Sequence, residues 1–316
     1  MYKFSEKAML NRRILRIKAF KELFAIEMLP DKSLALARKE LDRSLESTRD
    51  LYLFMLSSVC AITRAANEKF NQLQKKINKT EEERNPNLKF IENSLAPLLE
   101  SDVDFQKLLK KKGLEWGAYD LIVKKIYASM QTKEYFTGYM ADPERSLAAD
   151  CRLFVHVFEE EFVDREDLET ALEDLSIYWN DDLAYALTWC CKTVESLAKG
   201  DSWALPPLYL SDIRKGMADD DAFVHKLLNE SYANYDKFSA IISESVPNWD
   251  KDRLVGTDIA LIVTALSEIV SFGDIPVNVS INEYVEIAKY YGTPKSSTFV
   301  NGILDTLSKK VEFKKK

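Results

Sequence analysis

Apolar residues recur at intervals of three and four along most of the chain, which is the spacing of one buried face of an α-helix. The clearest case is segment 275–305, IPVNVSINEYVEIAKYYGTPKSSTFVNGILD. Ser280 and Glu283 form an S-x-x-E pattern, which is typical of a capped helix start. Gly292 predicts a helix end in the left-handed conformation, and a second helix is expected from near Ser296. The segment is therefore predicted to be a helix-turn-helix unit.

The same spacing predicts helices over most of the remaining sequence. Segment 257–272 is apolar on all sides, so it is expected at the centre of a bundle, where neighbours cover every face. Segment 80–87 is polar and contains a proline, which predicts a flexible connection. The chain has nine glycines, fewer than strands joined by tight turns usually need, so the fold class is predicted to be all-α. The other helical stretches are 11–28, 32–79, 88–140, 143–199, 217–232, 234–245 and 296–309.

The length of 316 residues and the hydrophobic content of 46% allow one large domain or two smaller ones. The motif DSWALPP at 201–207 interrupts the helical pattern and predicts a domain boundary. The expected domains are 1–203, an Arg-rich first helix followed by a helical insertion, and 204–316, a C-terminal helical bundle.

A faint internal repeat links the two expected domains. Residues 154–183 can be aligned with residues 223–254, because both stretches begin Phe-Val-His and both later reach a Trp-Asn or Trp-Asp turn, at Trp179 and Trp249. We interpret the insertion as a degenerate duplication of part of the C-terminal unit.

Charge is unevenly distributed along the sequence. The formal net charge of −7 argues against a protein that coats nucleic acid indiscriminately. Residues 1–26 nevertheless carry seven Lys or Arg against two Glu, and Arg12, Arg13 and Arg16 gather in the first turns of a helix. Two interpretations remain open. The cluster is either a solvated helix face, or a phosphate-binding site in which guanidinium groups also stack on unpaired bases.

Other functional classes receive little support from the residues. Segment 142–186 has fourteen Asp or Glu and three Arg, which we interpret as a solubilising face. No apolar run reaches the roughly 20 residues of a membrane helix, and the N-terminus lacks a signal-peptide core, so a cytoplasmic protein without membrane contact is expected. The four cysteines lack a zinc pattern, and no phosphate-binding glycine loop is present. No metal or cofactor is therefore expected.

Two segments resemble the NusB family of transcription antitermination factors. In residues 264–305, the patterns P-x-x-V-x-I-N-E, A-K-x-[YF]-G and S-x-x-F-V-N-G-[IV]-L-D follow one another in the family's order. Residues 11–27 resemble the family's Arg-rich opening helix. The chain is much longer than is usual in the family, and most of 29–203 is an insertion or a degenerate duplication.

The resemblance implies an all-α, NusB-like bundle enlarged by a helical insertion. It also implies a protein that binds boxA-like single-stranded RNA together with a small-subunit ribosomal protein, called NusE in this role. The partners would act in an RNA polymerase antitermination complex during ribosomal RNA transcription. The RNA-binding residues it implies are Arg12, Arg13, Arg16 and Phe299, and we add Ser296, with the free N–H groups of its helix start, as a further phosphate site. Phe24 and Asp258 fall near positions that contact either the protein partner or RNA.

Two other classes compete with this interpretation. One is a helical protein-interaction scaffold in which RNA binding has lapsed and the insertion docks proteins. The other is an enzyme, which we reject because no part of the sequence alternates strands with helices in the way of a nucleotide-binding catalytic domain.

Overall fold

The computed structural model describes residues 9–179, 181–203, 218–245 and 256–310. Within these ranges the regular elements are helices, and none of the described residues lies in a strand. None of the described helices combines the length and the apolar character needed to cross a bilayer. The predicted all-α fold class is confirmed.

The chain divides into two compact units. Unit 1 comprises Met1–Leu45 and Tyr209–Lys316, and unit 2 comprises Glu46–Leu208. This differs from the predicted division into 1–203 and 204–316, because the first helix belongs with the C-terminal bundle. The predicted boundary motif falls largely outside the described residues. The other boundary falls inside the continuous helix α2 (Leu34–Gln74), where no glycine, proline or polar loop marks it.

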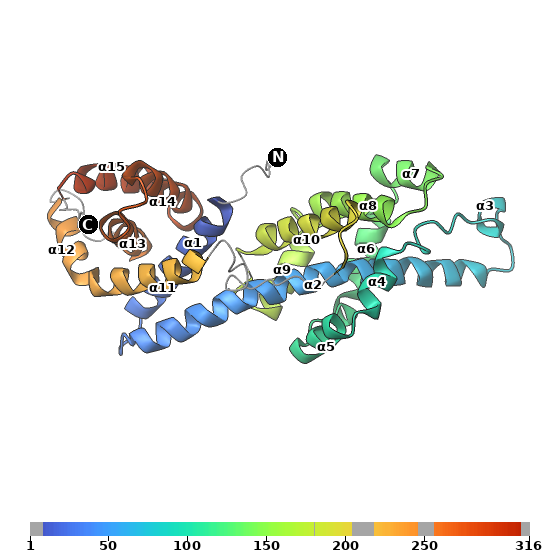
Figure 1. Ribbon diagram of the computed structural model, residues 1–316, viewed down its shortest axis with the longest axis horizontal. Helices are drawn as coiled ribbons and strands as arrows, with labels where there is room; N and C mark the ends of the chain where they lie inside the picture. Colours follow the sequence, from blue (N-terminus) through green and yellow to red (C-terminus); the bar gives the residue numbers. More distant parts are fainter. Residues whose placement is uncertain (1–8, 180, 204–217, 246–255, 311–316) are drawn as a thin grey trace. The chain divides into compact units, whose positions relative to one another are not determined.

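Unit 1 is a bundle built around one apolar helix (Figure 1). α13 packs against α1, α11, α12, α14 and α15, and every residue from Ala260 to Ile269 is buried. The predicted central helix is thus confirmed. The C-terminal helices agree with their predicted bounds to within one residue at each end, except at the start of α14. The helices of unit 1 besides the start of α2 are α1 (Met9–Glu27), α11 (Ala218–Ala233), α12 (Tyr235–Ser245), α13 (Gly256–Ser271), α14 (Val277–Tyr291) and α15 (Ser296–Ser308).

The start of α14 differs from its prediction. The helix begins at Val277, directly after Pro276, and not at a capping box on Ser280. Ser280 and Glu283 are both buried within the helix. Their side chains bond to neighbouring helices, Ser280 to Glu268 and Glu283 to Arg13. The predicted capping box is therefore wrong, because tertiary partners take the hydrogen bonds that a local cap would have used.

Gly292 ends α14 for a different reason from the one predicted. Its backbone is extended, with φ −104° and ψ −177°, so the predicted left-handed conformation is wrong. A Cβ atom at this position would lie 2.3 Å from Cβ of Ser296 and 2.8 Å from the carbonyl oxygen of Ala288. Glycine is needed here because the start of α15 approaches the end of α14 too closely for a side chain.

Unit 2 surrounds the long helix α2. Phe54 on α2 stacks on Trp116 at a ring-centroid distance of 4.2 Å and on Trp179 at 5.7 Å, and all three rings are buried. The repeat that pairs Trp179 with Trp249 stays a prediction, since residue 249 lies outside the described ranges. The further helices of unit 2 are α3 (Glu81–Arg84), α4 (Leu95–Ser101), α5 (Val103–Lys112), η1 (Gly117–Tyr119), α6 (Asp120–Met130), α7 (Glu134–Ala141), α8 (Leu147–Glu160), α9 (Glu166–Leu175) and α10 (Leu183–Ala198).

The segment predicted to be a flexible connection contains a short ordered turn. Thr80 and Glu83 form a reciprocal capping box at the start of α3. Glu83 also pairs with Lys76 at 2.7 Å. The S/T-x-x-E pattern therefore acts as a cap at this exposed site, where no buried partner competes for the two side chains.

We expect Gly292→Ala to destabilise unit 1. The added methyl group overlaps Ser296 and the Ala288 carbonyl, and overpacking of this kind typically costs about 1–3 kcal/mol. Gly302→Ala is the matched control, because nothing lies within 4 Å of a Cβ there and alanine favours a helix interior by up to about 1 kcal/mol. Urea denaturation of both variants measures the difference. Equal stability of the two variants would contradict the close-approach role.

A second prediction concerns the dependence of stability on pH. Burial, and then the nearby Glu40, raise the pKa of Glu22 from 4.5 to about 7, although Lys18 and Lys21 act in the opposite direction. Because the folded-state pKa lies above the unfolded one, this group's contribution to stability is lost as pH rises from 4.5 towards 7. Glu22→Gln should therefore be more stable than the wild type near pH 8 and similar to it near pH 4. Urea titrations across this range measure the effect, and a stability difference that does not change with pH would rule it out.

Candidate nucleic-acid interface

A buried network of charged side chains joins α1 to α13 and α14. The Arg16 side chain donates from Nε and Nη2 to the two carboxylate oxygens of Glu268, at 2.8 Å each. Glu268 also accepts hydrogen bonds from Ser280 Oγ at 2.6 Å and from the Tyr284 hydroxyl at 3.0 Å. Four donors thus satisfy a carboxylate that is 0% exposed, which offsets the cost of removing its charge from water.

Arg13 extends this network towards the surface. Its Nε and Nη2 donate to Glu283 Oε2 and Oε1 at 2.8 and 2.7 Å, and Glu283 also lies 3.6 Å from Nη1 of Arg16. The Arg13 side chain is 33% exposed. The hydrogen bonds that Arg13 donates to Glu283 raise the pKa of Arg13, so its guanidinium keeps its charge. Two guanidinium groups and two carboxylates therefore form a bidentate, electrically balanced cluster.

The neighbouring Arg12 lies in different surroundings. Its guanidinium carbon is 5.4 Å from the ring centroid of Phe223, and that of Arg16 is 5.6 Å from the same ring. Such a position over an aromatic ring attracts a cation through the ring quadrupole. Phe223 itself packs edge-on against Phe272 at 5.0 Å. Arg12 is half-buried and is anchored by aromatic packing.

The three arginines predicted to bind RNA are therefore not equivalent. Arg16 is 2% exposed and bound to Glu268, so the structure does not favour a direct phosphate contact, and its role here is to hold helices together. Arg13 is partly exposed but shared with Glu283. Arg12 and Arg13 remain the members of the trio that are accessible to a ligand.

Ser296 and Asp258 form a second buried contact, at the start of α15. Ser296 is 1% exposed. Its hydroxyl accepts from the Thr293 backbone N–H at 2.8 Å and donates to Asp258 Oδ2 at 2.9 Å. The predicted phosphate site on Ser296 is not open in this structure, because the hydroxyl is enclosed and already bonded. Burial raises the pKa of Asp258, and the hydrogen bond from Ser296 opposes that shift.

The two aromatic residues singled out in the sequence also lie differently from expectation. Phe299 is 9% exposed and belongs to the core of unit 1, so it does not form an open stacking surface. Phe24 is half-buried, and a Cβ added to Gly256 at the start of α13 would lie 3.4 Å from the Phe24 ring. Phe24 thus lies where α1 meets α13.

An exposed aromatic residue on α14 was not predicted. Tyr290 is 67% exposed. It lies between Ala288, which packs in the core of unit 1, and Tyr291, which packs against that core. Its position outside the spacing of three and four residues is the sequence signal that could have identified it as an exposed aromatic residue. Arg13 contacts Glu283, and farther along the same two helices Phe20 contacts Tyr291 at 5.7 Å. α1 and α14 therefore run side by side in the same direction, with Arg13 near one end of the pair and Tyr290 near the other.

Comparisons with known proteins agree with this bundle. The sequence model of the NusB family matches residues 197–309. A transcription antitermination protein NusB from Alkaliphilus oremlandii is 44% identical over 82 residues, which are 26% of this chain and 59% of that protein. The protein of the same name from Bacillus licheniformis is 38% identical over 94 residues, which cover 30% and 73% of the two chains. No solved structure matches the chain.

These matches place the all-helical bundle in a family whose listed members are named transcription antitermination proteins. A further relative of the same name, from Listeria monocytogenes, is 39% identical over 97 residues, which are 30% of this chain and 76% of the relative. The chain belongs to the NusB family. The match covers about three fifths to three quarters of these relatives' length and lies in the C-terminal part of this chain.

Removal of the Arg16 side chain should cost much more stability than removal of Arg12. Arg16→Met leaves the Glu268 carboxylate buried without its cation, and breaking a buried pair in this way typically costs about 3–5 kcal/mol. Arg12→Met removes a cation from a ring surface, which is typically worth about 1 kcal/mol. Urea denaturation measures both, and Arg16→Met combined with Glu268→Gln should lose less than the sum of the single changes. Similar costs for the two arginine variants would show that the network does not hold the bundle together.

Proposed function

We propose that this protein is an RNA-binding transcription antitermination factor. It would bind boxA-like single-stranded RNA together with the small-subunit ribosomal protein NusE, as part of an RNA polymerase antitermination complex during ribosomal RNA transcription. The observation that carries the proposal is the contact between the two segments that resemble the family. The Arg-rich helix α1 packs on α13 and α14, and Arg13 binds Glu283 across more than 200 residues of sequence.

In this proposal Arg12 and Arg13 contact RNA phosphates. Both side chains are partly accessible, and guanidinium groups bind phosphate oxygens through several donors in one plane. Because Glu283 already holds Arg13, a phosphate would have to share or replace that carboxylate. The Arg13 contact should therefore contribute less affinity than an unpaired arginine would.

Tyr290 is the residue proposed to stack on an unpaired base. Its ring is exposed beside Lys289 on the last turn of α14, and base stacking on an aromatic side chain is typically worth about 1–3 kcal/mol. Phe299 and Ser296 support this surface from inside the bundle. Phe24 and Asp258, near the start of α13, contact either RNA or the protein partner.

Fluorescence anisotropy with a labelled boxA-like RNA tests the proposal across a range of salt concentrations. Arg12→Met and Arg13→Met should each weaken binding and lower the slope of log affinity against log salt by about 0.7. Tyr290→Ala should weaken binding by about 5- to 150-fold with little change in that slope. Arg38→Met is the control, because Arg38 is an exposed arginine of the same unit that bonds to Asn229.

Two results would count against this proposal. An Arg12→Met/Arg13→Met double variant that unfolds like the wild type, yet binds RNA with the same affinity and salt slope, would contradict it. Equal binding of boxA-like and scrambled RNA would leave only generic electrostatic attraction.

A protein-interaction scaffold is the second candidate. The observation that favours it is the neutralisation of the basic cluster, because Arg13 and Arg16 are both paired with carboxylates. Residues 46–208 add 29 Asp or Glu against 20 Lys or Arg, which repels a polyanion. Recovery of the ribosomal protein or polymerase in a pull-down, without RNA affinity even when that partner is present, would favour the scaffold.

A further inference from the structure

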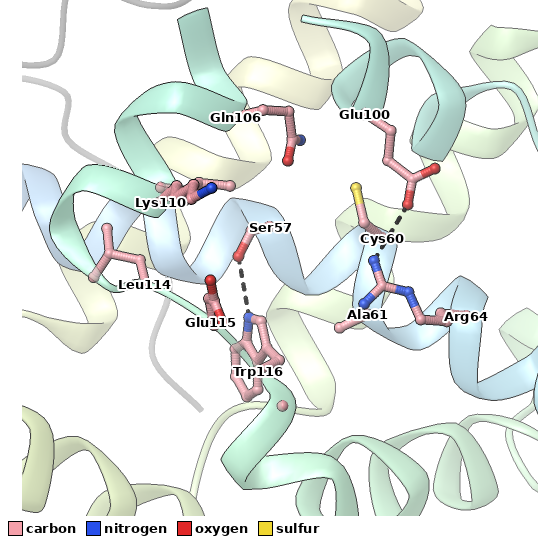
Figure 2. Close-up of a pocket in the computed structure, with 12 residues that line it drawn as sticks. Ser57, Cys60, Ala61, Arg64, Glu100, Gln106, Lys110, Leu114, Glu115 and Trp116 are labelled. Carbon is pink, nitrogen blue, oxygen red and sulfur yellow. Dashed lines mark hydrogen bonds and ion pairs between the residues drawn. The ribbon is translucent and has the colours of Figure 1, made fainter. Parts of the chain in front are cut away.

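Unit 2 contains a cavity of about 460 Å³ between α2, α4 and α5. Figure 2 shows its floor on α2 and its walls on the other two helices and on the turn after α5. Cavities of this size are typical of small-molecule binding sites. The lining lies within residues 57–117, outside both segments that resemble the NusB family. A ligand in this cavity is therefore independent of the proposed RNA-binding function.

The apolar wall of the cavity is held in a fixed position. Gly113 ends α5 with φ +67°, in the left-handed region that favours glycine, and the turn brings Leu114 and Trp116 to the cavity. The Trp116 Nε1–H lies 3.0 Å from the Phe54 carbonyl and 3.2 Å from Ser57 Oγ. Its ring stacks on Phe54 at 4.2 Å. These contacts hold the Trp116 ring in place before any ligand binds.

The charged groups of the lining are balanced in number. Arg64 and Glu100 lie 3.5 Å apart, with side chains 67% and 49% exposed, and such an exposed pair is readily exchanged for other partners. Lys110 and Glu115 also line the cavity, and within the described part of the chain neither forms an ion pair. Two cations therefore face two carboxylates, and a ligand with a single charge would meet a like charge as well as an opposite one.

Two further groups define what the cavity offers. The Gln106 amide donates from Nε2 to the Leu99 carbonyl at 3.0 Å, and its oxygen points into the space in front of α2 (Figure 2). Burial raises the pKa of the Cys60 thiol to about 12. The thiol is therefore protonated and is not a nucleophile near neutral pH. These features favour reversible binding over covalent chemistry.

We propose that this cavity binds a small zwitterion with an apolar side chain, of the chemical class of free leucine or phenylalanine. The ligand carboxylate would bind Lys110, and its ammonium group would bind Glu115 on the same side of the opening (Figure 2). The apolar side chain would pack against Leu109, Leu114 and Trp116. Only a ligand that carries both charges satisfies both sets of side chains at once.

Isothermal titration calorimetry of the full chain tests the ligand class. L-leucine and L-phenylalanine should bind saturably, whereas the N-acetyl and carboxamide derivatives, which each lack one charge, should bind at least about tenfold more weakly. The absence of saturable binding of any amino acid up to about 10 mM would overturn the proposal. So would equal affinity for the charged and blocked forms.

Two variants assign the charges to residues. Lys110→Met should weaken binding of the amino acid but cause little further loss for the carboxamide, which has no carboxylate to bind. Glu115→Gln should weaken binding of the amino acid but not of the N-acetyl form. Lys111→Met is the control, because Lys111 is an exposed neighbour that does not line the cavity. Both lining residues are exposed, and matching denaturation curves confirm folding. Binding that both variants leave unchanged would refute the assignment.

Discussion

The contact between Arg16 and Glu268 is the interaction on which unit 1 depends most. It fastens the first helix of the chain to the apolar helix at the centre of a bundle whose other helices are the start of α2 and those within Tyr209–Lys316. Buried charges are costly unless they are fully paired. Here the hydroxyl groups of Ser280 and Tyr284 complete the pairing, and burial raises the pKa of Tyr284 well above its usual value, so its hydroxyl stays protonated and donates. A surface formed by α1 together with α14 therefore depends on the contacts of Arg16 and Glu268, because these contacts join the two helices through α13.

The same network determines which basic residues can meet a ligand. It encloses Arg16, shares Arg13 with Glu283 and leaves Arg12 over an aromatic ring. The basic surplus of the first 26 residues therefore produces a weaker field than its formal charge suggests, since part of it is neutralised by internal pairs. In the proposed function, such a face would select its partner mainly through short-range contacts, and the exposed Tyr290 ring would supply one of them.

Much of the helical framework could be predicted from the sequence, because apolar periodicity reports burial directly. The central helix and the bounds of its neighbours followed from that pattern. Arg16 stands four residues before Phe20 and seven before Leu23, so its place on the buried face was also encoded, but the charge led to a surface interpretation. Ser280 and Glu283 fitted a local cap, and only tertiary contacts reveal that other helices bind them. The unit boundary inside α2 has no local signal.

Ultraviolet cross-linking of the full chain to a boxA-like RNA, followed by peptide mass spectrometry, tests most directly whether the two ends of the chain build one RNA-binding face. We expect cross-linked peptides from both α1, around Arg13, and the end of α14, around Tyr290. They should be reduced together in Arg16→Met, because this substitution removes the buried ion pair that joins α1 to α13. Cross-links confined to one of these helices, or found instead on the acidic helices of unit 2, would contradict a shared face.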